Sequence, residues 1–390
     1  MNALKAAAAC LVGYFLFAVF RFIIGFILPR LTAEFMLTPV EAGAFASAPA
    51  LSGVLIMSLA GHIGDRLGKK LPLVIGMLML WAGAFICSVS PSYILALISI
   101  FFAGLGAGFL GPNIYSLMGE IQPKSRASMI GITAAIYSFG GFAGSIIFGF
   151  TTAVYGWRIS LGALAAVGLI HAAAMFLCLD STLSKENSQV KIKPPGFSQF
   201  NSFRLRNIVI AGLSIFMGMY AQFVIMSWTP TYFMKAGIDP SFTGVIIAIY
   251  SLAGGFSSII SGRIADVFGE KKLLLFAGFI AATVSLPIYL YHLGLVHSVI
   301  LMLMLGFFHF PYWNLVLSMV QRNADSNTVG VTMGIVQNIG TVGGMVGPTL
   351  AGLAIQSWGF EQGMIASVTM PLLLYAALIV LYKHTPKTSR

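Results

Sequence analysis

Long apolar runs alternate with short polar breaks along almost the whole chain. Each run has about 20 residues, the length that a helix needs to cross the hydrocarbon core of a bilayer. The runs are continuous and do not alternate between apolar and polar residues, which excludes the strands of a membrane β-barrel. The pattern predicts an all-α membrane protein with twelve spans, at residues 7–29, 41–60, 71–90, 93–117, 129–152, 159–179, 207–231, 243–261, 273–291, 296–319, 330–356 and 363–382.

One polar stretch is much longer than the others. Residues 181–206 contain many Ser, Lys, Asn and Gln residues and the pair Pro194-Pro195, a composition typical of a flexible linker. We therefore expect an N-terminal six-helix bundle at 1–180, a linker at 181–206 and a C-terminal six-helix bundle at 207–390.

A short charged motif occurs twice, each time between the second and third apolar runs of its half. Residues 61–70 read Gly-His-Ile-Gly-Asp-Arg-Leu-Gly-Lys-Lys, and residues 262–272 read Gly-Arg-Ile-Ala-Asp-Val-Phe-Gly-Glu-Lys-Lys. The matching pairs, all 201 residues apart (262 minus 61), are Gly61 and Gly262, Asp65 and Asp266, and Gly68 and Gly269. Duplication at one spacing indicates two similar membrane halves.

The chemistry of the repeated motif indicates a gate. Its glycines permit a sharp turn at the membrane surface. Asp65 is expected to accept hydrogen bonds from a neighbouring helix N-terminus or to pair with Arg66 or Lys70, and so to latch one side of the protein. The alternative is that these residues are ordinary charges of surface loops.

Composition and charge agree with a membrane protein. Hydrophobic residues make up 58% of the chain, charged residues 8%, and the mean hydropathy is +0.92, whereas soluble domains have about 25% charged residues. If the N-terminus is cytoplasmic, eighteen of the 22 Lys and Arg residues lie in inner segments and three in outer loops. The net charge of +11 then reflects a multi-pass topology in the cell membrane, with both termini inside and contact with anionic lipid, and not binding to nucleic acid.

One cation lies deep inside a predicted span. Arg21 is in the middle of the first span, where a guanidinium costs at least about 2.5–3.5 kcal/mol unless it has a partner or a wet cavity. All acidic residues lie in loops or at helix ends, at Glu34, Glu41, Asp65, Glu120, Asp180, Glu186, Asp239, Asp266, Glu270, Asp325 and Glu361. We therefore expect Arg21 to bind the anionic group of a substrate. The alternatives are snorkelling and bonds to backbone carbonyls.

The surroundings of Arg21 fit a ligand site. Tyr14, Ala18, Arg21 and Gly25 share one helix face. The small Ala18 and Gly25 leave room for a ligand, although small residues also let helices pack closely.

Other polar groups in the spans are candidates for the transport path. His309 is a candidate proton carrier because imidazole titrates near physiological pH, and the alternative is a structural histidine. The uncharged candidates also fit as groups that hold helices together; they are Asn113, Tyr115, Tyr137, Tyr220, Gln222, Tyr250, Gln337 and Asn338.

No pattern indicates an enzyme or a cofactor. The chain lacks a phosphate-binding Gly-x-x-x-x-Gly-Lys-Ser/Thr loop, a plausible serine-histidine-acid set and a Cys/His metal cluster. Cys10, Cys87 and Cys178 each stand alone in an apolar segment. We expect no cofactor and no metal, and a protein that works as a monomer.

The arrangement of spans and the repeated motif resemble the major facilitator superfamily over the whole chain. The first copy of the motif matches the family's Gly-x-x-x-Asp-Arg-x-Gly-Arg/Lys-Arg/Lys loop at every key position. Residues 155–158, Tyr-Gly-Trp-Arg, resemble a second recurrent feature, with Gly359-Phe360 as its weaker counterpart. Residues 228–232, Trp-Thr-Pro-Thr-Tyr, resemble the end of the seventh span in organic-anion symporters of the superfamily.

The resemblance implies the fold, the cavity and the activity. Spans one, four, seven and ten line the family's cavity, which favours Asn113, Gln222, Tyr312, Trp313 and Asn314 as substrate contacts. The sequence departs from two family patterns: the glycine-proline motif of antiporters, which they carry in the fifth span, is here in the eleventh (Gly347-Pro348), and Ile100 replaces a frequent fourth-span arginine. The role of that arginine cannot be transferred.

Three functions fit these observations. The first is a secondary transporter that moves a small organic anion, with a carboxylate as the expected anionic group, through alternating access with proton coupling or anion exchange. The second is an exporter of drugs or metabolites, although a cavity with Arg21 and no acid repels cationic drugs. The third is a membrane sensor that does not transport.

Overall fold

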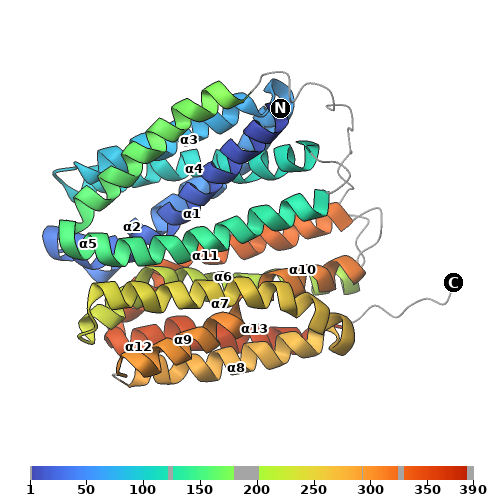
Figure 1. The fold of residues 1–390 in the computed structure, drawn as a ribbon. Helices are drawn as coiled ribbons and strands as arrows, with labels where there is room; N and C mark the ends of the chain where they lie inside the picture. Colours follow the sequence, from blue (N-terminus) through green and yellow to red (C-terminus); the bar gives the residue numbers. More distant parts are fainter. Residues whose placement is uncertain (1, 122–125, 180–201, 292, 324–328, 384–390) are drawn as a thin grey trace. The chain divides into compact units, whose positions relative to one another are not determined.

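The computed structural model describes residues 2–121, 126–179, 202–291, 293–323 and 329–383. Within these ranges the chain is helical and contains no β-strand (Figure 1). The helices are α1 (Asn2–Phe35), α2 (Pro39–Leu67), α3 (Lys70–Ser88), α4 (Tyr93–Ile121), α5 (Arg126–Cys178), α6 (Ser202–Lys235), α7 (Pro240–Phe268), α8 (Glu270–Leu290), α9 (Leu295–His309), α10 (Tyr312–Asn323), α11 (Val329–Trp358), α12 (Phe360–Met364), the π-helix η3 (Ile365–Thr369) and α13 (Met370–Leu381).

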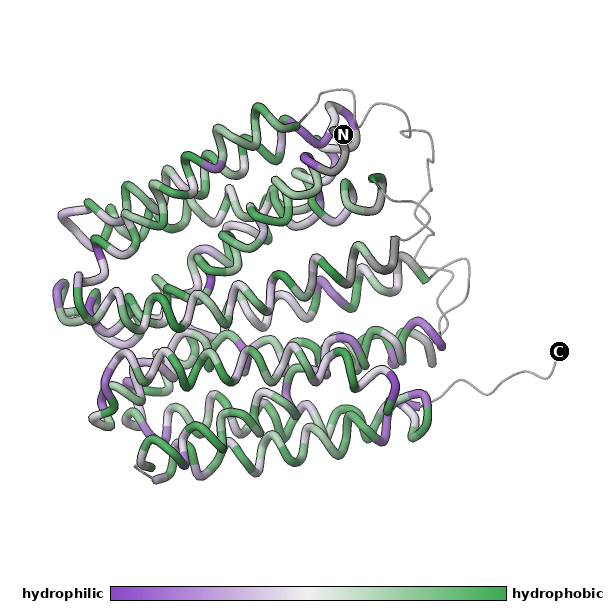
Figure 2. The backbone as a smooth tube through the Cα atoms, in the orientation of Figure 1, coloured by the Kyte–Doolittle hydropathy of each residue, from purple (hydrophilic) through white to green (hydrophobic). Residues whose placement is uncertain are grey.

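These helices account for the predicted spans. Eleven described helical segments are long and apolar enough to cross a membrane, and Figure 2 shows hydrophilic residues mainly at their ends. One of the eleven, Ala135–Cys178, contains two spans because Gly156 has a non-helical backbone (φ 80°, ψ 166°). The all-α membrane fold is therefore confirmed, and each of the twelve predicted spans has its helix.

Two boundaries differ from the prediction. The helix α6 begins at Ser202, so the last five residues of the expected linker are helical; residues 180–201 lie outside the described ranges. The tenth span is broken into α9 and α10 at Phe310 and Pro311. Pro311 lacks the N–H that would continue the ladder of helical hydrogen bonds.

The chain forms two compact units. The first contains Met1–Val190 and Met226–Ser251, and the second contains Lys191–Ile225 and Leu252–Arg390. The helices α6 and α7 each contribute to both units. In the first unit α1 packs on α5 and α4 packs on α2 and α3, and in the second α8 packs on α9 and α13.

The duplication seen in the repeated motif extends to the backbone of its turns. Gly68 and Gly269 have φ angles of 88° and 84°. Gly156 and Gly359, which are 203 residues apart (359 minus 156), have φ angles of 80° and 86°. These angles are open to glycine and strained for residues with a Cβ. Gly68 and Gly269 therefore make the sharp turn that the sequence predicts, whereas Gly61, Gly64 and Gly262 lie within the helices α2 and α7.

A second turn repeats at the same spacing of 201 residues, between α1 and α2 and between α6 and α7. Thr38 and Asp239 stand before the prolines that start α2 and α7, and each accepts a hydrogen bond from the backbone of its helix's first turn. One position differs: Met36 has φ 51°, whereas its counterpart Gly237 has φ 86°. Met36 therefore occupies a left-handed position that glycine fills in the second half.

Met36→Gly is expected to raise the thermal stability of the protein slightly. A residue with a Cβ in this backbone region is strained by about 1–2 kcal/mol, and glycine removes this strain. The greater conformational entropy of glycine in the unfolded chain cancels about 0.5–1 kcal/mol of the gain. The Met36 side chain is 89% exposed, so few contacts are lost. Thermal unfolding in detergent measures the change. Met36→Ala keeps the strain and serves as the control; an equal gain in both variants would contradict the explanation.

The packing of α1 corrects one expectation about the space around Arg21. A Cβ on Gly140 of α5 would lie 2.6 Å from the Cβ of Ala18, and a Cβ on Gly25 would lie 2.1 Å from the carbonyl oxygen of Met226. Ala18 and Gly25 therefore serve close helix packing, and they do not leave room for a ligand.

Candidate functional site

An aromatic cluster lies beside the deep arginine of the first unit. The Tyr14 hydroxyl donates to the Tyr115 hydroxyl at 3.4 Å, and the two rings meet edge to face at 5.7 Å. The ring of Tyr137 lies 5.7 Å from Tyr14 and 6.3 Å from Phe17. The cluster of Tyr14, Phe17, Tyr115 and Tyr137 thus combines α1, α4 and α5. Tyr14 and Tyr137 were expected near a ligand; Phe17 was missed because a lone Phe in a span carries no signal.

Arg21 lies two helical turns from Tyr14 on α1. It is half-buried, and its charge acts on the Tyr14 hydroxyl. Arg21 also has an interaction with the rest of the chain. A guanidinium near tyrosine hydroxyls and aromatic faces provides charge, hydrogen bonds and stacking surface in one region.

A second polar cluster lies in the second unit, where α9 breaks into α10. The Tyr312 hydroxyl donates to Oε1 of Gln222 at 2.8 Å. The ring of His309 stacks on that of Tyr312 at 5.1 Å, and Nε2 of His309 lies 3.2 Å from the Gly218 carbonyl oxygen, to which it donates. The bond to Tyr312 fixes the Gln222 amide and leaves its N–H groups as donors for another acceptor.

Gly218 is the packing surface for this cluster. A Cβ at Gly218 would lie 2.4 Å from the Tyr312 ring. Gly218→Ala is expected to lower the stability by about 1 kcal/mol. Overpacking against the Tyr312 ring destabilises by about 1–3 kcal/mol, and the higher helix propensity of alanine stabilises by about 1 kcal/mol.

Gly334→Ala is the matched control for Gly218→Ala, since its Cβ would meet nothing within 4 Å. It should be neutral or stabilising by about 0.5–1 kcal/mol. Thermal unfolding and ligand binding measure both variants. Equal effects of the two substitutions would show that the packing of the Tyr312 ring does not require a glycine at position 218.

The remaining candidates have different surroundings. Asn113 is fully buried, and its amide donates to the carbonyl oxygens of Ala60 (3.2 Å) and Phe109 (2.8 Å), which favours a role in packing α4 on α2.

The other candidates lie at different depths. Tyr250 is also fully buried, and Trp313 packs against the core of the second unit. Tyr220 is half-buried and stacks on Phe216. Gln337 is half-buried, and Asn314 and Asn338 are exposed.

The second copy of the repeated motif forms an ion network. Arg322, at the end of α10, pairs with Asp266 at 2.6 Å and with Glu270 at 2.7 Å. The Ser318 hydroxyl donates to Glu270 at 3.0 Å. The turn at Gly269, between α7 and α8, is therefore tied to α10. Neither Arg322 nor Ser318 belongs to the motif, so sequence spacing did not reveal these partners.

The first copy is described in part. Lys70 places its Nζ 4.6 Å from the centre of the Phe176 ring, a cation–π contact. Gly61 lies near Pro112, and the Arg66 side chain is exposed. The side chain of Asp65 lies outside the described residues, so its role as a latch stays a prediction.

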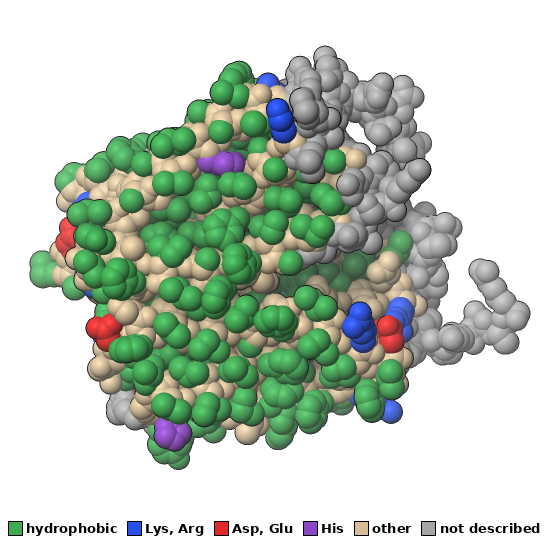
Figure 3. Space-filling model, viewed as in Figure 1, with side chains coloured by type: hydrophobic (Ala, Val, Ile, Leu, Met, Phe, Trp, Pro, Cys, Tyr) green, Lys and Arg blue, Asp and Glu red, His purple; other side chains and the backbone are tan. Residues whose placement is uncertain are grey.

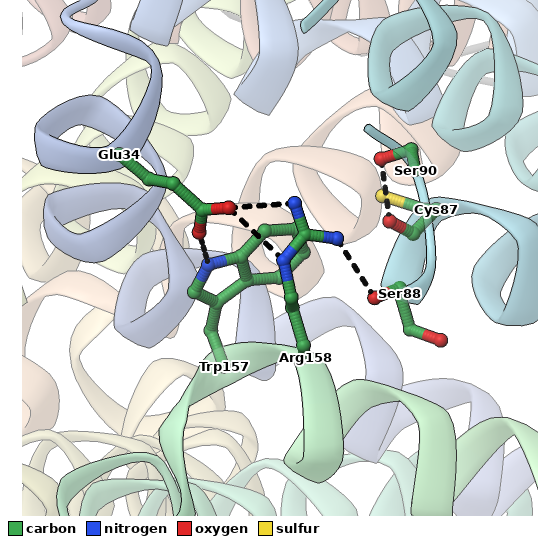
Figure 4. Close-up of polar contacts among 6 residues, drawn as sticks. All are labelled: Glu34, Cys87, Ser88, Ser90, Trp157 and Arg158. Carbon is green, nitrogen blue, oxygen red and sulfur yellow. Dashed lines mark hydrogen bonds and ion pairs between the residues drawn. The ribbon is translucent and has the colours of Figure 1, made fainter. Parts of the chain in front are cut away.

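A further polar contact joins three helices at the other end of the first unit (Figure 4). Arg158 donates through Nε (3.0 Å) and Nη2 (2.6 Å) to Oε1 of Glu34, and through Nη1 to the carbonyl oxygen of Ser88 (3.1 Å). Trp157 Nε1 donates to Oε2 of Glu34 at 2.7 Å. This tether, formed by Glu34, Ser88, Trp157 and Arg158, links the ends of α1 and α3 to the start of the second span of α5. The sequence showed the Trp-Arg pair but not its partner.

The described residues contain no group of three or more His, Cys, Asp and Glu side chains that could hold a metal ion.

The comparison with known families decides the class of protein. The family model "Major Facilitator Superfamily" matches residues 10–348. The chain belongs to the Major Facilitator Superfamily. Its membership confirms the resemblance that the repeated motif indicated, and places the chain among multi-pass membrane transporters.

Relatives within the family differ in their named substrates. The hexuronate transporter of Bacillus subtilis (strain 168) is 24% identical, over 86% of this chain and 84% of its own. The 4-hydroxybenzoate transporter PcaK of Pseudomonas aeruginosa is 27% identical, over 92% and 87%. Multidrug resistance protein 1 of Bacillus subtilis (strain 168) is 24% identical, over 83% of both chains.

A solved family structure agrees with the fold. A bacterial homologue of the human lysosomal transporter Spinster, in an inward-facing and unoccupied conformation, has a TM-score of 0.82 and 15% identity, with 98% of this chain and 97% of that chain covered. At this identity the likeness concerns the fold alone.

Proposed function

We propose that this family member is a secondary transporter of a small organic anion, with a carboxylate that binds at Arg21. The observation that carries the proposal is the half-buried Arg21 in the middle of α1, beside the cluster of Tyr14, Phe17, Tyr115 and Tyr137. The planar fork of N–H donors on a guanidinium matches the two oxygens of a carboxylate. The aromatic rings favour a substrate with a flat ring.

The relatives support this substrate class. Two of the three relatives above are named for carboxylates, one of a sugar and one of an aromatic ring. The cluster of four aromatic side chains fits the aromatic acid better, because a flat ring can stack on it.

The transport cycle is proposed to be alternating access. The bundles at 1–180 and 207–390, joined by the linker at 181–206, would expose the site to each side of the cell membrane in turn. The distribution of Lys and Arg favours cytoplasmic termini. The turns that contain Asp65 and Asp266 would latch the cytoplasmic side, and one chain would suffice as a monomer.

Proton coupling through His309 gives a pH prediction. Nε2 of His309 donates to the Gly218 carbonyl oxygen, so the other ring nitrogen is the one that can gain a proton. His309→Gln is expected to flatten the pH dependence of uptake between about pH 5 and 8 while it preserves substrate counterflow. An unchanged pH profile would make His309 a structural residue and would favour anion exchange.

Two other functions compete with this proposal. A drug exporter is favoured by the multidrug relative, but the positive charge of Arg21 opposes a cationic drug. A membrane sensor would bind the anion without moving it. An enzyme is not proposed, because the family and these relatives are named as transporters.

A matched-ligand screen tests the proposal. The thermal unfolding of the purified protein is measured with 4-hydroxybenzoate, with its carboxamide, with a hexuronate and with cationic drugs. The carboxylates should raise the melting temperature and the carboxamide should not, because only the charge differs. A shift with cationic drugs alone would support the exporter instead.

A further inference from the structure

The end of the last helix is held by side chains from two other helices of the second unit. Arg206 at the start of α6 donates to the carbonyl oxygen of Leu381 at 2.7 Å. Lys271 at the start of α8 donates to the carbonyl oxygens of Val380 (3.0 Å) and Tyr382 (2.7 Å). The last carbonyls of a helix have no partners within the helix, and cations are favourable there. The end of α13 therefore gathers two cations.

Two more cations stand at the same place. Lys272 follows Lys271, and Lys383 follows the capped carbonyls; both side chains are exposed. The backbone of Lys383 is held by Asn207, whose amide donates to the Lys383 carbonyl oxygen at 2.7 Å. We name Arg206, Lys271, Lys272 and Lys383 the basic cap.

The acidic residues near the basic cap form ion pairs with a residue outside it. Asp266 and Glu270 both pair with Arg322 on α10. Among the described residues, no carboxylate forms an ion pair with any member of the basic cap. Four positively charged side chains therefore stand near one helix end, whose carbonyls carry a partial negative charge.

Apolar side chains continue directly from the basic cap. Leu205 beside Arg206, and Val380 and Leu381 at the capped end, are 48%, 58% and 53% exposed. Figure 3 shows basic side chains, with an acidic side chain among them, at one end of the helices around α8, and hydrophobic side chains along the adjoining surface. In a membrane-spanning bundle such a border lies where acyl chains meet headgroups.

We propose that the basic cap binds the phosphodiester of an anionic glycerophospholipid, with the acyl chains on the adjoining apolar flank. The charge of the basic cap complements the phosphate, and the exposed Val380 and Leu381 give the tails a surface that a free phosphate would not use. The side-chain Nζ atoms of Lys272 and Lys383 make no hydrogen bond within the described chain and are the ones that contact the lipid. Bound lipid would tie the ends of α6, α8 and α13 together.

The test uses the full chain purified in detergent and compares phosphatidylglycerol with phosphatidylcholine of the same acyl chains. Thermal unfolding gives the stabilisation, and native mass spectrometry counts the bound lipids. Lys272→Gln/Lys383→Gln removes two charges of the basic cap without removing a bond to α13. Lys5→Gln/Arg263→Gln removes two exposed cations elsewhere and is the matched control. Glycerol 3-phosphate tests for a free-phosphate site.

Phosphatidylglycerol should raise the melting temperature of the parent and of the control more than phosphatidylcholine does. The basic-cap variant should lose at least half of that difference and retain fewer phosphatidylglycerol molecules, and added salt should reduce the effect. Three results would overturn the proposal: equal stabilisation of the parent by both lipids, full retention of the difference by the basic-cap variant, or the same stabilisation by glycerol 3-phosphate. None of these measurements depends on transport, so they are independent of the proposed function.

Discussion

Arg21→Gln is expected to abolish measurable anion binding while the protein still folds. Removal of one partner from a desolvated charge pair costs about 2–5 kcal/mol, which corresponds to about 30-fold to several thousand-fold in affinity. The fold should survive because the substitution removes a charge whose burial at membrane depth is itself costly. Calorimetry on monodisperse protein, with 4-hydroxybenzoate as ligand, measures the affinity.

Two further variants separate charge from geometry. Arg21→Lys keeps the positive charge but loses the planar pair of donors, so it should lose only part of the affinity. Arg30→Gln makes the same change nine residues further along α1, towards the helix end, and should bind the anion like the parent. If Arg21→Gln bound the anion as tightly as the parent, an exporter of neutral compounds would become the better explanation.

Arg158→Gln is expected to lower the stability of the first unit by about 1–3 kcal/mol. Three charge-assisted hydrogen bonds would contribute about 1.5–3 kcal/mol each if they were buried. The side chains of Arg158 and Glu34 are 31% and 40% exposed, and exposed ion pairs contribute only about 0.2–1 kcal/mol each. Because both side chains are partly exposed, the expected loss of stability follows the smaller value per bond.

Variants of the tether test how its contribution to stability is divided among its hydrogen bonds. Trp157→Phe keeps the ring and removes only the N–H that reaches Glu34, so its loss should be smaller than that of Arg158→Gln. Combining Glu34→Gln with Arg158→Gln should cost less than the sum of the single changes, because the two side chains contact each other. Strict additivity in thermal unfolding would show that the tether contributes nothing as a unit.

The spans and the duplication follow from the sequence because they depend on local composition and on a fixed spacing. Twenty apolar residues need no knowledge of neighbours to be recognised as a span. The repeated Gly68 and Gly269 predict a turn because few other residues adopt that backbone. For the same reason the left-handed turn at Met36 was missed: methionine gives no signal, and only its counterpart Gly237 reveals the position.

Side-chain partners were much harder to predict, because helical periodicity gives a face but not what faces it. Ala18 shares a face with Arg21, yet it packs against Gly140 of α5. Asn113, a predicted cavity residue, donates to the backbone carbonyls of Ala60 and Phe109, and its place in the sequence does not reveal these partners. Glu34 and Arg158 are 124 positions apart in sequence, so no local pattern pairs them. Such pairs are set by how the helices cross, which depends on the whole bundle.

Uptake into proteoliposomes tests the central claim most directly. Purified protein is reconstituted, labelled 4-hydroxybenzoate is added outside, and accumulation is followed with and without an excess of unlabelled 4-hydroxybenzoate or its carboxamide inside the vesicles. We predict that the unlabelled carboxylate drives counterflow of the label, that the carboxamide does not, and that Arg21→Gln vesicles behave like empty ones. Binding without any accumulation would contradict a transporter and support a sensor, and counterflow that Arg21→Gln leaves intact would contradict the site.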